Sequence, residues 1–225
     1  RGQSPHYHNV IINQLSNFWQ ILQAHETALP EGFAERMDRI LDFPIAYTRP
    51  DLSIAQFGDS DNDPMPDKLR NWGALFDRPD YLYLASDGAE GEQPAQQDRL
   101  FPQGGFASLR SSWDDGRDQR WLLFDFGPYG RGAFRLLSID CAAYGRPLIS
   151  MPGRYRYHTE DDTRARFMST PFQNTVSIDG ANQRTNPPRG LLRADLEGPE
   201  KIVHAWHGGY AHLAGDDAPE DAIVH

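Results

Sequence analysis

The chain has 225 residues, of which 39% are hydrophobic and 24% are charged, a composition typical of a globular protein with a sizeable core. Its net charge of −10 argues against nucleic acid as the main partner. No run of about 18 apolar residues is present, so the sequence predicts no membrane-spanning helix. The single Cys141 permits no internal disulfide.

The chain begins with a segment that predicts a helix. Between residues 10 and 22, apolar side chains recur at spacings of four, three and four, which is the pattern of one helical face. They are Ile11, Leu15, Phe18 and Leu22. Ser4 and Pro5 precede this stretch and suit a helix start, with Ser4 as the cap and Pro5 in the first turn.

Two further helices follow. The first is expected from Glu31 to about Phe43, with Pro44 ending or kinking it. Its inward side chains are expected to be Phe33, Met37, Ile40 and Leu41. The second, over residues 67–76, is short. Between them, residues 57–67 (FGDSDNDPMPD) form a turn-rich loop whose four aspartates lack the spacing of a calcium site, which favours a solvated loop.

Residues 87–98 (DGAEGEQPAQQD) are polar and contain Gly and Pro, which makes them the best linker candidate. Beyond them the pattern changes to short segments rich in β-formers and separated by turn residues. These segments are Gly105–Arg110, Arg120–Phe126, Phe134–Tyr144, Asn174–Ile178, Leu191–Leu196 and Lys201–Trp206. Such spacing predicts an antiparallel sandwich. The predicted domains are therefore residues 1–86 and 99–225, joined by the linker.

The positive charges are distributed unevenly. Arg outnumbers Lys 20 to 2, and nine of the Arg lie between residues 117 and 166, where six carboxylates leave a net charge of +3. Guanidinium groups pair with carboxylates and sulfates through two parallel hydrogen bonds, so this window fits an anionic ligand. A genome that favours Arg codons, together with ordinary surface charge, is the alternative explanation.

From Tyr144 to Gly180, two predicted strands dense in Arg and Tyr surround a Pro-Gly turn (YGRPLISMPGRYRYH, then STPFQNTVSIDG). The chain also contains, in order, the segments QSPHYH, GDSD and FPQGGFASLRSSW before this stretch and HGGY after it. Together, these segments resemble the heparinase II/III-like superfamily of polysaccharide lyases, which includes alginate lyases. The resemblance covers most of the chain. It implies an α+β, multidomain protein: the end of an incomplete (α/α) toroid, then an antiparallel β-sandwich, with the active site between them. It also leads us to expect part of a longer protein that is periplasmic or secreted.

The resemblance implies β-elimination on a uronic-acid-containing anionic polysaccharide. In this reaction the substrate carboxylate is neutralised, a base removes the C5 proton and an acid protonates the leaving O4. Tyr7, in QSPHYH, matches the family's acid/base tyrosine, and Tyr157 and His158 are further catalytic candidates. The substrate-binding candidates are Arg131, Arg135, Tyr155, Arg164 and Asn174. On a strand, Tyr155 and Tyr157 would share one face and Arg154 and Arg156 the other.

The chain departs from the family's pattern at several positions. In metal-containing relatives two His and one Asp bind zinc, whereas the matching positions here hold Ala133, Met151 and Gln173. These are poor zinc ligands, so we predict neither a metal nor another cofactor. The family's first His is Arg131, a poor proton acceptor. The alternative is therefore an inactive relative that binds an anionic glycan, for example in exopolysaccharide export or assembly, or a β-region that only supports a site elsewhere. The oligomeric state is not predicted.

Overall fold

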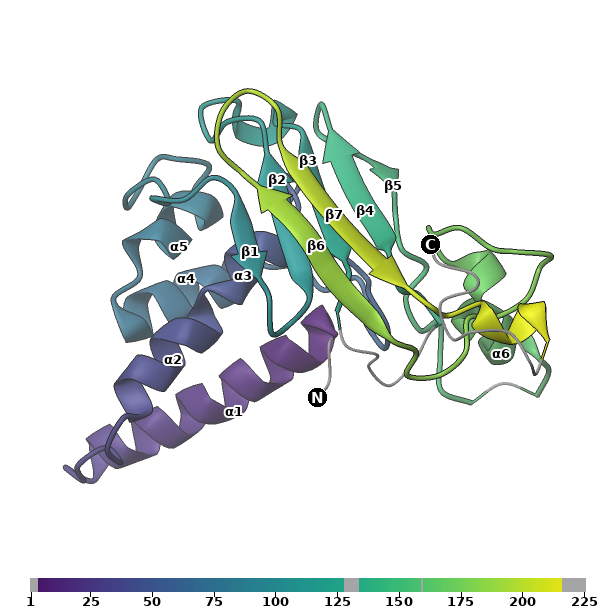
Figure 1. The fold of residues 1–225 in the computed structure, drawn as a ribbon. Helices are drawn as coiled ribbons and strands as arrows, with labels where there is room; N and C mark the ends of the chain where they lie inside the picture. Colours follow the sequence, from purple (N-terminus) through teal and green to yellow (C-terminus); the bar gives the residue numbers. More distant parts are fainter. Residues whose placement is uncertain (1–3, 128–133, 159, 216–225) are drawn as a thin grey trace.

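The computed structural model describes residues 4–127, 134–158 and 160–215 (Figure 1). Helices form the first part: α1 (Pro5–Ala24), α2 (Phe33–Leu41), α3 (Phe43–Tyr47), α4 (Pro66–Phe76) and α5 (Pro79–Ala85). An antiparallel sheet in the order β1-β2-β3-β4-β5 follows, built from β1 (Arg99–Phe101), β2 (Phe106–Arg110), β3 (Trp121–Asp125), β4 (Ser138–Ala143) and β5 (Arg146–Ile149). After α6 (Thr163–Met168), β6 (Arg189–Asp195) and β7 (Ile202–His207) form an antiparallel hairpin. The described part of the chain is thus an α+β protein.

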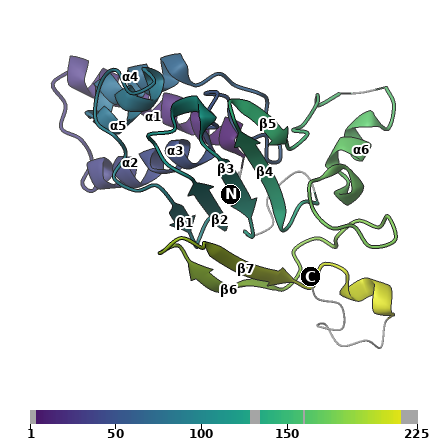
Figure 2. The same ribbon diagram turned by 90° about the horizontal axis from the view of Figure 1, so that it is seen from above.

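The elements lie in layers, with helices α1–α5 on one face of the longer sheet and the β6–β7 hairpin on the other (Figure 2). Strand alternation explains this arrangement, because successive side chains point to opposite faces. In β2, Phe106 packs with the helices, whereas its neighbour Ala107 packs beneath the hairpin. The hydrogen bond from Trp121 Nε1 to the carbonyl oxygen of Ala46 (3.0 Å) fixes β3 to α3.

The main hydrophobic core is continuous from the helices to the sheet. It combines buried side chains of α1, α2 and α4, such as Ile12, Leu41 and Trp72, with strand residues such as Trp121. Residues 87–98 contain no helix or strand. The division into residues 1–86, 87–98 and 99–225 stays a prediction. Within the described residues, no helix combines the length and apolarity needed to cross a membrane.

The predicted cap of α1 is confirmed, but its predicted inner face is partly wrong. The Ser4 side chain accepts a hydrogen bond from the N–H of Tyr7, and Pro5 is the first helical residue. Ile11 and Phe18 are exposed, whereas Ile12 is fully buried. Leu15 packs against the main core, so only part of the predicted face is turned inward.

The other helix predictions are largely confirmed. Met37 and Leu41 of α2 are buried, and α4 begins one residue before the predicted start. The helical region is interrupted just before Pro44: α2 ends at Leu41, and Pro44 lies in the first turn of α3, where its missing N–H is not needed. The sequence prediction missed α5 and α6, which are short.

Among the strands, those at β2, β3, β6 and β7 are confirmed within two residues. β4 is shorter than predicted, β5 lies in the strand region predicted before the Pro-Gly turn, and β1 was not predicted. The expected strand over residues 174–178 is wrong: that segment joins β4 only near Asn174, whose carbonyl oxygen accepts from the N–H of Ile139 at 3.1 Å.

Candidate functional site

The hydroxyl groups of Tyr7 and Tyr157 form a hydrogen bond with each other, although 150 positions separate the residues in the chain. Tyr7 lies in the first turn of α1, where the Ser4 cap sets the helix start. Tyr157 lies in a stretch without regular structure after β5. The side chains are 39% and 40% exposed, so a polymer in solution can reach both. The structure thus brings together two of the three predicted catalytic residues.

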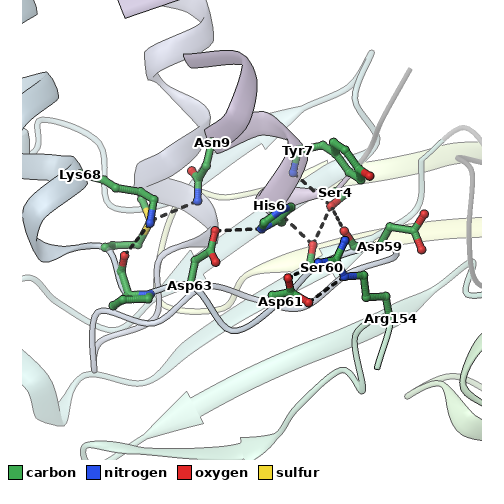
Figure 3. Close-up of polar contacts among 12 residues, drawn as sticks. Ser4, His6, Tyr7, Asn9, Asp59, Ser60, Asp61, Asp63, Lys68 and Arg154 are labelled. Carbon is green, nitrogen blue, oxygen red and sulfur yellow. Dashed lines mark hydrogen bonds and ion pairs between the residues drawn. The ribbon is translucent and has the colours of Figure 1, made fainter. Parts of the chain in front are cut away.

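The loop over residues 57–63, here called the acidic loop, supports the Tyr7 side of this contact (Figure 3). The Ser60 hydroxyl lies 2.8 Å from that of Ser4, and the N–H of His6 donates to it at 3.3 Å. The Ser4 hydroxyl also donates to the carbonyl oxygen of Asp59 at 2.9 Å. Ser4 and Ser60 are both buried. The acidic loop therefore fixes the start of α1.

Three aspartates of the acidic loop bind side chains from other segments. Asp63 lies 3.0 Å from Nδ1 of His6, and Asp59 accepts from Arg164 at 3.0 Å. Asp61 accepts from both Nε and Nη2 of Arg154, with the Nε bond at 2.8 Å. The expectation of a solvated loop is wrong for these positions, because the Arg-rich segment folds back onto the loop.

The same two arginines lie against Tyr157. The guanidinium carbon of Arg154 is 4.4 Å from the centre of the Tyr157 ring, and that of Arg164 is 4.8 Å from it. Cations within about 6 Å of an aromatic ring are attracted to its face. Arg164 also donates to the carbonyl oxygens of Arg154 and Arg156, each at 3.2 Å. Tyr157 is therefore held by cations that the acidic loop anchors.

The predicted strand through residues 154–158 is not observed. Tyr155 has a φ of +60°, a left-handed conformation that breaks the alternation of a strand. Its ring stacks on Phe167 of α6 at 5.0 Å between centroids, and Arg156 lies 4.6 Å from its centre. Consequently Tyr155 and Tyr157 do not share a face, and Tyr157 lies with Arg154 instead.

The remaining candidates lie in different places. His158 is exposed and lines a polar groove with Tyr155, Arg156, Glu160, Asp161 and Thr163. Arg135 is 2% exposed and pairs with the buried Asp125 at 3.2 Å, so the structure offers its guanidinium no contact with a polymer. The Asn174 amide donates to the carbonyl oxygen of Ile139 at 3.1 Å, which is a structural role. Arg131 lies outside the described residues.

The positions that match the family's zinc ligands do not suit that metal. Met151 is buried, and its N–H donates to Asp140 at 3.0 Å. The side-chain amide of Gln173 is buried and donates to the carbonyl oxygen of Phe167 at 2.6 Å. Thioether and amide groups are weak zinc ligands. Ala133 lies outside the described residues, and across the described ones no group of three or more His, Cys, Asp or Glu could hold a metal ion.

The Tyr7–Tyr157 contact affects the ionisation of Tyr7. The hydrogen bond to Tyr157 raises the pKa of Tyr7, partial burial and the charge of Asp59 add to this, and Arg154 opposes it. The raised pKa favours the protonated form of the Tyr7 hydroxyl over the phenolate.

The sequence prediction missed His6, Arg154, Asp59 and Asp61 as parts of the site. The available signal was charge complementarity: an Arg-rich segment and a loop with four aspartates occur in one otherwise acidic chain. Neither segment predicts by itself which partner it meets.

Comparison with known proteins matches both halves of the chain to one family. Residues 2–83 match the heparinase II/III N-terminus, and residues 93–216 match the heparinase II/III-like C-terminal region. A heparin-sulfate lyase from Bacteroides stercoris is 27% identical over 192 residues, which are 79% of this chain and 28% of that protein. A heparin-sulfate lyase from Pedobacter heparinus is 26% identical over 171 residues, which are 70% of this chain and 25% of that one.

Two solved structures, one of a heparinase III and one of a heparan sulfate lyase, also match the chain. A heparinase III structure matches with a TM-score of 0.84 at 25% identity, and the match covers 92% of this chain and 34% of that one. The heparan sulfate lyase of Pedobacter heparinus matches with a TM-score of 0.83 at 18% identity, over the same shares. The chain therefore spans about a quarter to a third of the length of these relatives.

Proposed function

The chain belongs to the heparinase II/III-like family, and we propose that it contributes active-site residues of a polysaccharide lyase that cleaves a uronic-acid-containing anionic polysaccharide by β-elimination. The observation that carries this proposal is the exposed contact between the Tyr7 and Tyr157 hydroxyl groups beside Arg154 and Arg164. The relatives named as heparin-sulfate lyases make a sulfated glycosaminoglycan the first substrate to test.

The proposed reaction breaks two bonds and forms one double bond. A base takes the C5 proton of the uronate, and the C–H electron pair becomes the second bond between C4 and C5. The C4–O4 bond then breaks, and O4 leaves with a proton from an acid. Tyr7 suits the acid role, because its hydroxyl is exposed and carries a proton at neutral pH. Tyr157 is its hydrogen-bond partner, and His158 is the proposed base.

The C5 proton becomes acidic enough only when the neighbouring carboxylate is neutralised. Arg164, together with Arg154, places positive charge beside the tyrosine pair. Arg side chains carry a positive charge at neutral pH. We assign the carboxylate-binding role to Arg131, because Arg154 and Arg164 already pair with Asp61 and Asp59.

We further propose that the fold follows the family's arrangement. Helices α1–α5 would be the last helices of an (α/α) toroid, and β1–β7 would belong to an antiparallel β-sandwich. The exposed apolar side chains of Ile11 and Phe18 on α1 support this, because further helices would cover them. The family relationship also favours a periplasmic or secreted protein.

The test follows the ultraviolet absorbance of the unsaturated uronate while the full-length protein is mixed separately with heparan sulfate, alginate, hyaluronan and glucuronan. Absorbance should rise with at least one polymer, and Tyr7→Phe, Tyr157→Phe and His158→Gln should each abolish most of the rise. Tyr144→Phe is the matched control, because Tyr144 is 71% exposed at the turn between β4 and β5. Binding of a polymer by calorimetry without any rise would replace the lyase proposal with the glycan-binding alternative.

A further inference from the structure

Tyr157 lies in an irregular segment, so its position depends on side-chain contacts rather than on a sheet or helix. The guanidinium groups of Arg154 and Arg164 lie over its ring at 4.4 and 4.8 Å. A cation over an aromatic ring restrains the ring only if the cation is itself held in place. What fixes these arginines therefore also fixes Tyr157.

Both arginines are held by the acidic loop. Asp61 binds Arg154 through both carboxylate oxygens, and Asp59 binds Arg164 at 3.0 Å. These groups are less than 40% exposed, and paired Arg–carboxylate bonds of this kind add geometric specificity as well as energy. The backbone takes part as well, since the N–H of Arg154 donates to the carbonyl oxygen of Ser60 at 3.2 Å.

Consecutive residues of the acidic loop thus contact the groups that hold each of the two tyrosines. Ser60 binds Ser4 and the N–H of His6 at the start of α1, which carries Tyr7. Its neighbours Asp59 and Asp61 bind the arginines beside Tyr157. Because three adjacent residues make these contacts, a shift of the segment that carries Tyr157 is transmitted through very few bonds to the start of α1, which carries Tyr7.

We propose that Asp59 and Asp61 are positioning residues, which act through Arg164 and Arg154 to keep the Tyr157 hydroxyl against that of Tyr7. Neither aspartate supplies or takes a proton in the reaction. The activity part of this inference rests on the proposed lyase function. A misplacement of about 1 Å can lower a rate about 100-fold, so the aspartates are expected to affect turnover rather than binding.

If the same carboxylates had a different role, their removal would change KM instead of kcat. If Asp61 occupied Arg154 in competition with the carboxylate of the substrate, its removal would free the guanidinium and lower KM. If Asp61 positions Tyr157, its removal lowers kcat and leaves KM nearly unchanged. The two roles are therefore separated by one kinetic measurement.

The experiment compares the full-length protein with Asp59→Asn and Asp61→Asn. The control is Asp195→Asn, which removes the same charge from the exposed ion pair with Arg193 on β6. We expect kcat to fall about 10- to 100-fold for each test variant, with KM within about twofold and no change for the control. In a Tyr157→Phe background, Asp61→Asn should lower kcat no further, because the residue acts through that hydroxyl.

A second readout needs no activity. Tyrosines labelled at the ring carbon that bears the hydroxyl are titrated by NMR, and the Tyr7 signal is identified by its loss in Tyr7→Phe. Asp61→Asn should bring the pKa of Tyr7 down towards its ordinary value, because the hydrogen bond to Tyr157 that raises it is lost. Tyr157, Asp59 and Arg154 act on the pKa of Tyr7, and the His6 ring lies edge to face with the Tyr7 ring. Asp61→Asn leaves all four side chains in place and removes the carboxylate charge that is bound to Arg154.

The outcomes separate this inference from the proposed function. If no polymer is cleaved but Asp61→Asn still shifts the Tyr7 titration, the lyase proposal fails and the positioning role holds. If the protein is active and Asp61→Asn changes neither kcat nor the titration, the positioning role is wrong and the lyase proposal stands. A lower KM for Asp61→Asn, or an equal fall in kcat for Asp195→Asn, would also overturn the positioning role.

Discussion

Gly153 lies directly against the carbonyl oxygen of Ser60: a Cβ atom on Gly153 would be only 2.6 Å from that oxygen. Gly153 also has a φ of +69°, a conformation that glycine adopts readily and other residues rarely do. The backbone of the acidic loop and that of the segment carrying Tyr157 therefore meet at a point where no side chain fits. This close approach places Arg154 within reach of Asp61.

We predict that Gly153→Ala lowers both stability and activity. The left-handed φ alone costs about 1–3 kcal/mol, and the Cβ contact must in addition push the two backbones apart. The matched control is Gly180→Ala, because Gly180 has the same φ of +69° but nothing within 4 Å of a Cβ. Urea denaturation should show a larger loss of free energy of unfolding for Gly153→Ala, and lyase activity should fall for this variant alone. Equal effects at both positions would show that the contact with Ser60 does not matter.

A second prediction concerns the tyrosine pair as a unit. Tyr7→Phe and Tyr157→Phe should each lower kcat about 100-fold or more, the range for a lost acid or base. Groups that act together give non-additive losses, so the double variant should be little slower than the slower single variant. Single-turnover kinetics on the most rapidly cleaved polymer measures all three. Losses that multiply would mean that the hydroxyl groups work independently, despite their hydrogen bond.

His8 gives a prediction for stability at acid pH. It lies on the inner side of α1, where its Nε2 is 2.9 Å from the carbonyl oxygen of Ile40 and its ring meets Phe43 and Tyr47 edge to face. Burial lowers the pKa of His8, and the hydrogen bond to Ile40 opposes this only in part. The folded state thus favours neutral His8, so its stabilising effect is present above the unfolded-state pKa of about 6.5 and is lost as the pH falls through the lower folded-state value.

The free energy of unfolding should therefore decrease below about pH 6.5, and His8→Gln should show a weaker decrease. Gln keeps a polar group near Ile40 but cannot gain a proton, so it should cost about 1 kcal/mol at neutral pH. His25→Gln, at the exposed end of α1, is the control and should keep the pH dependence of the unchanged protein. Urea denaturation at several pH values measures this. An unchanged slope for His8→Gln would assign the acid sensitivity to other groups.

The helices were predictable because their signals are local. The cap at Ser4, the proline at position 5 and the apolar spacing in α2 act within one or two turns. Which stripe of α1 is buried was not predictable from the same pattern, because Ile11 and Ile12 are equally apolar and the choice depends on what packs against the helix. Tertiary contacts decide such cases.

The conformation of the segment around Tyr155, in contrast to that of the helices, was not predictable from local sequence. Alternating Arg and Tyr predict a strand, yet the Arg side chains find partners in the acidic loop and in aromatic rings instead of in a sheet. Tyr7 and Tyr157 were named by the family resemblance, which carries no distance between them. Their contact, and the part that Asp59 and Asp61 play in it, depend on a chain reversal that no local pattern encodes.

The last prediction concerns the ion pair of Arg49 and Asp140, which joins the segment after α3 to β4. Nε and Nη2 of Arg49 donate to the two carboxylate oxygens at 2.8 and 2.6 Å, and both side chains are at most 2% exposed. Removing one partner of such a pair leaves a buried charge without compensation, so Arg49→Met should cost about 3–5 kcal/mol of unfolding free energy. Arg70→Met is the control, because the pair of Arg70 with Glu90 is at least half exposed and should cost less than about 1 kcal/mol. Chemical denaturation measures both, and similar losses would contradict the assignment of the larger effect to burial.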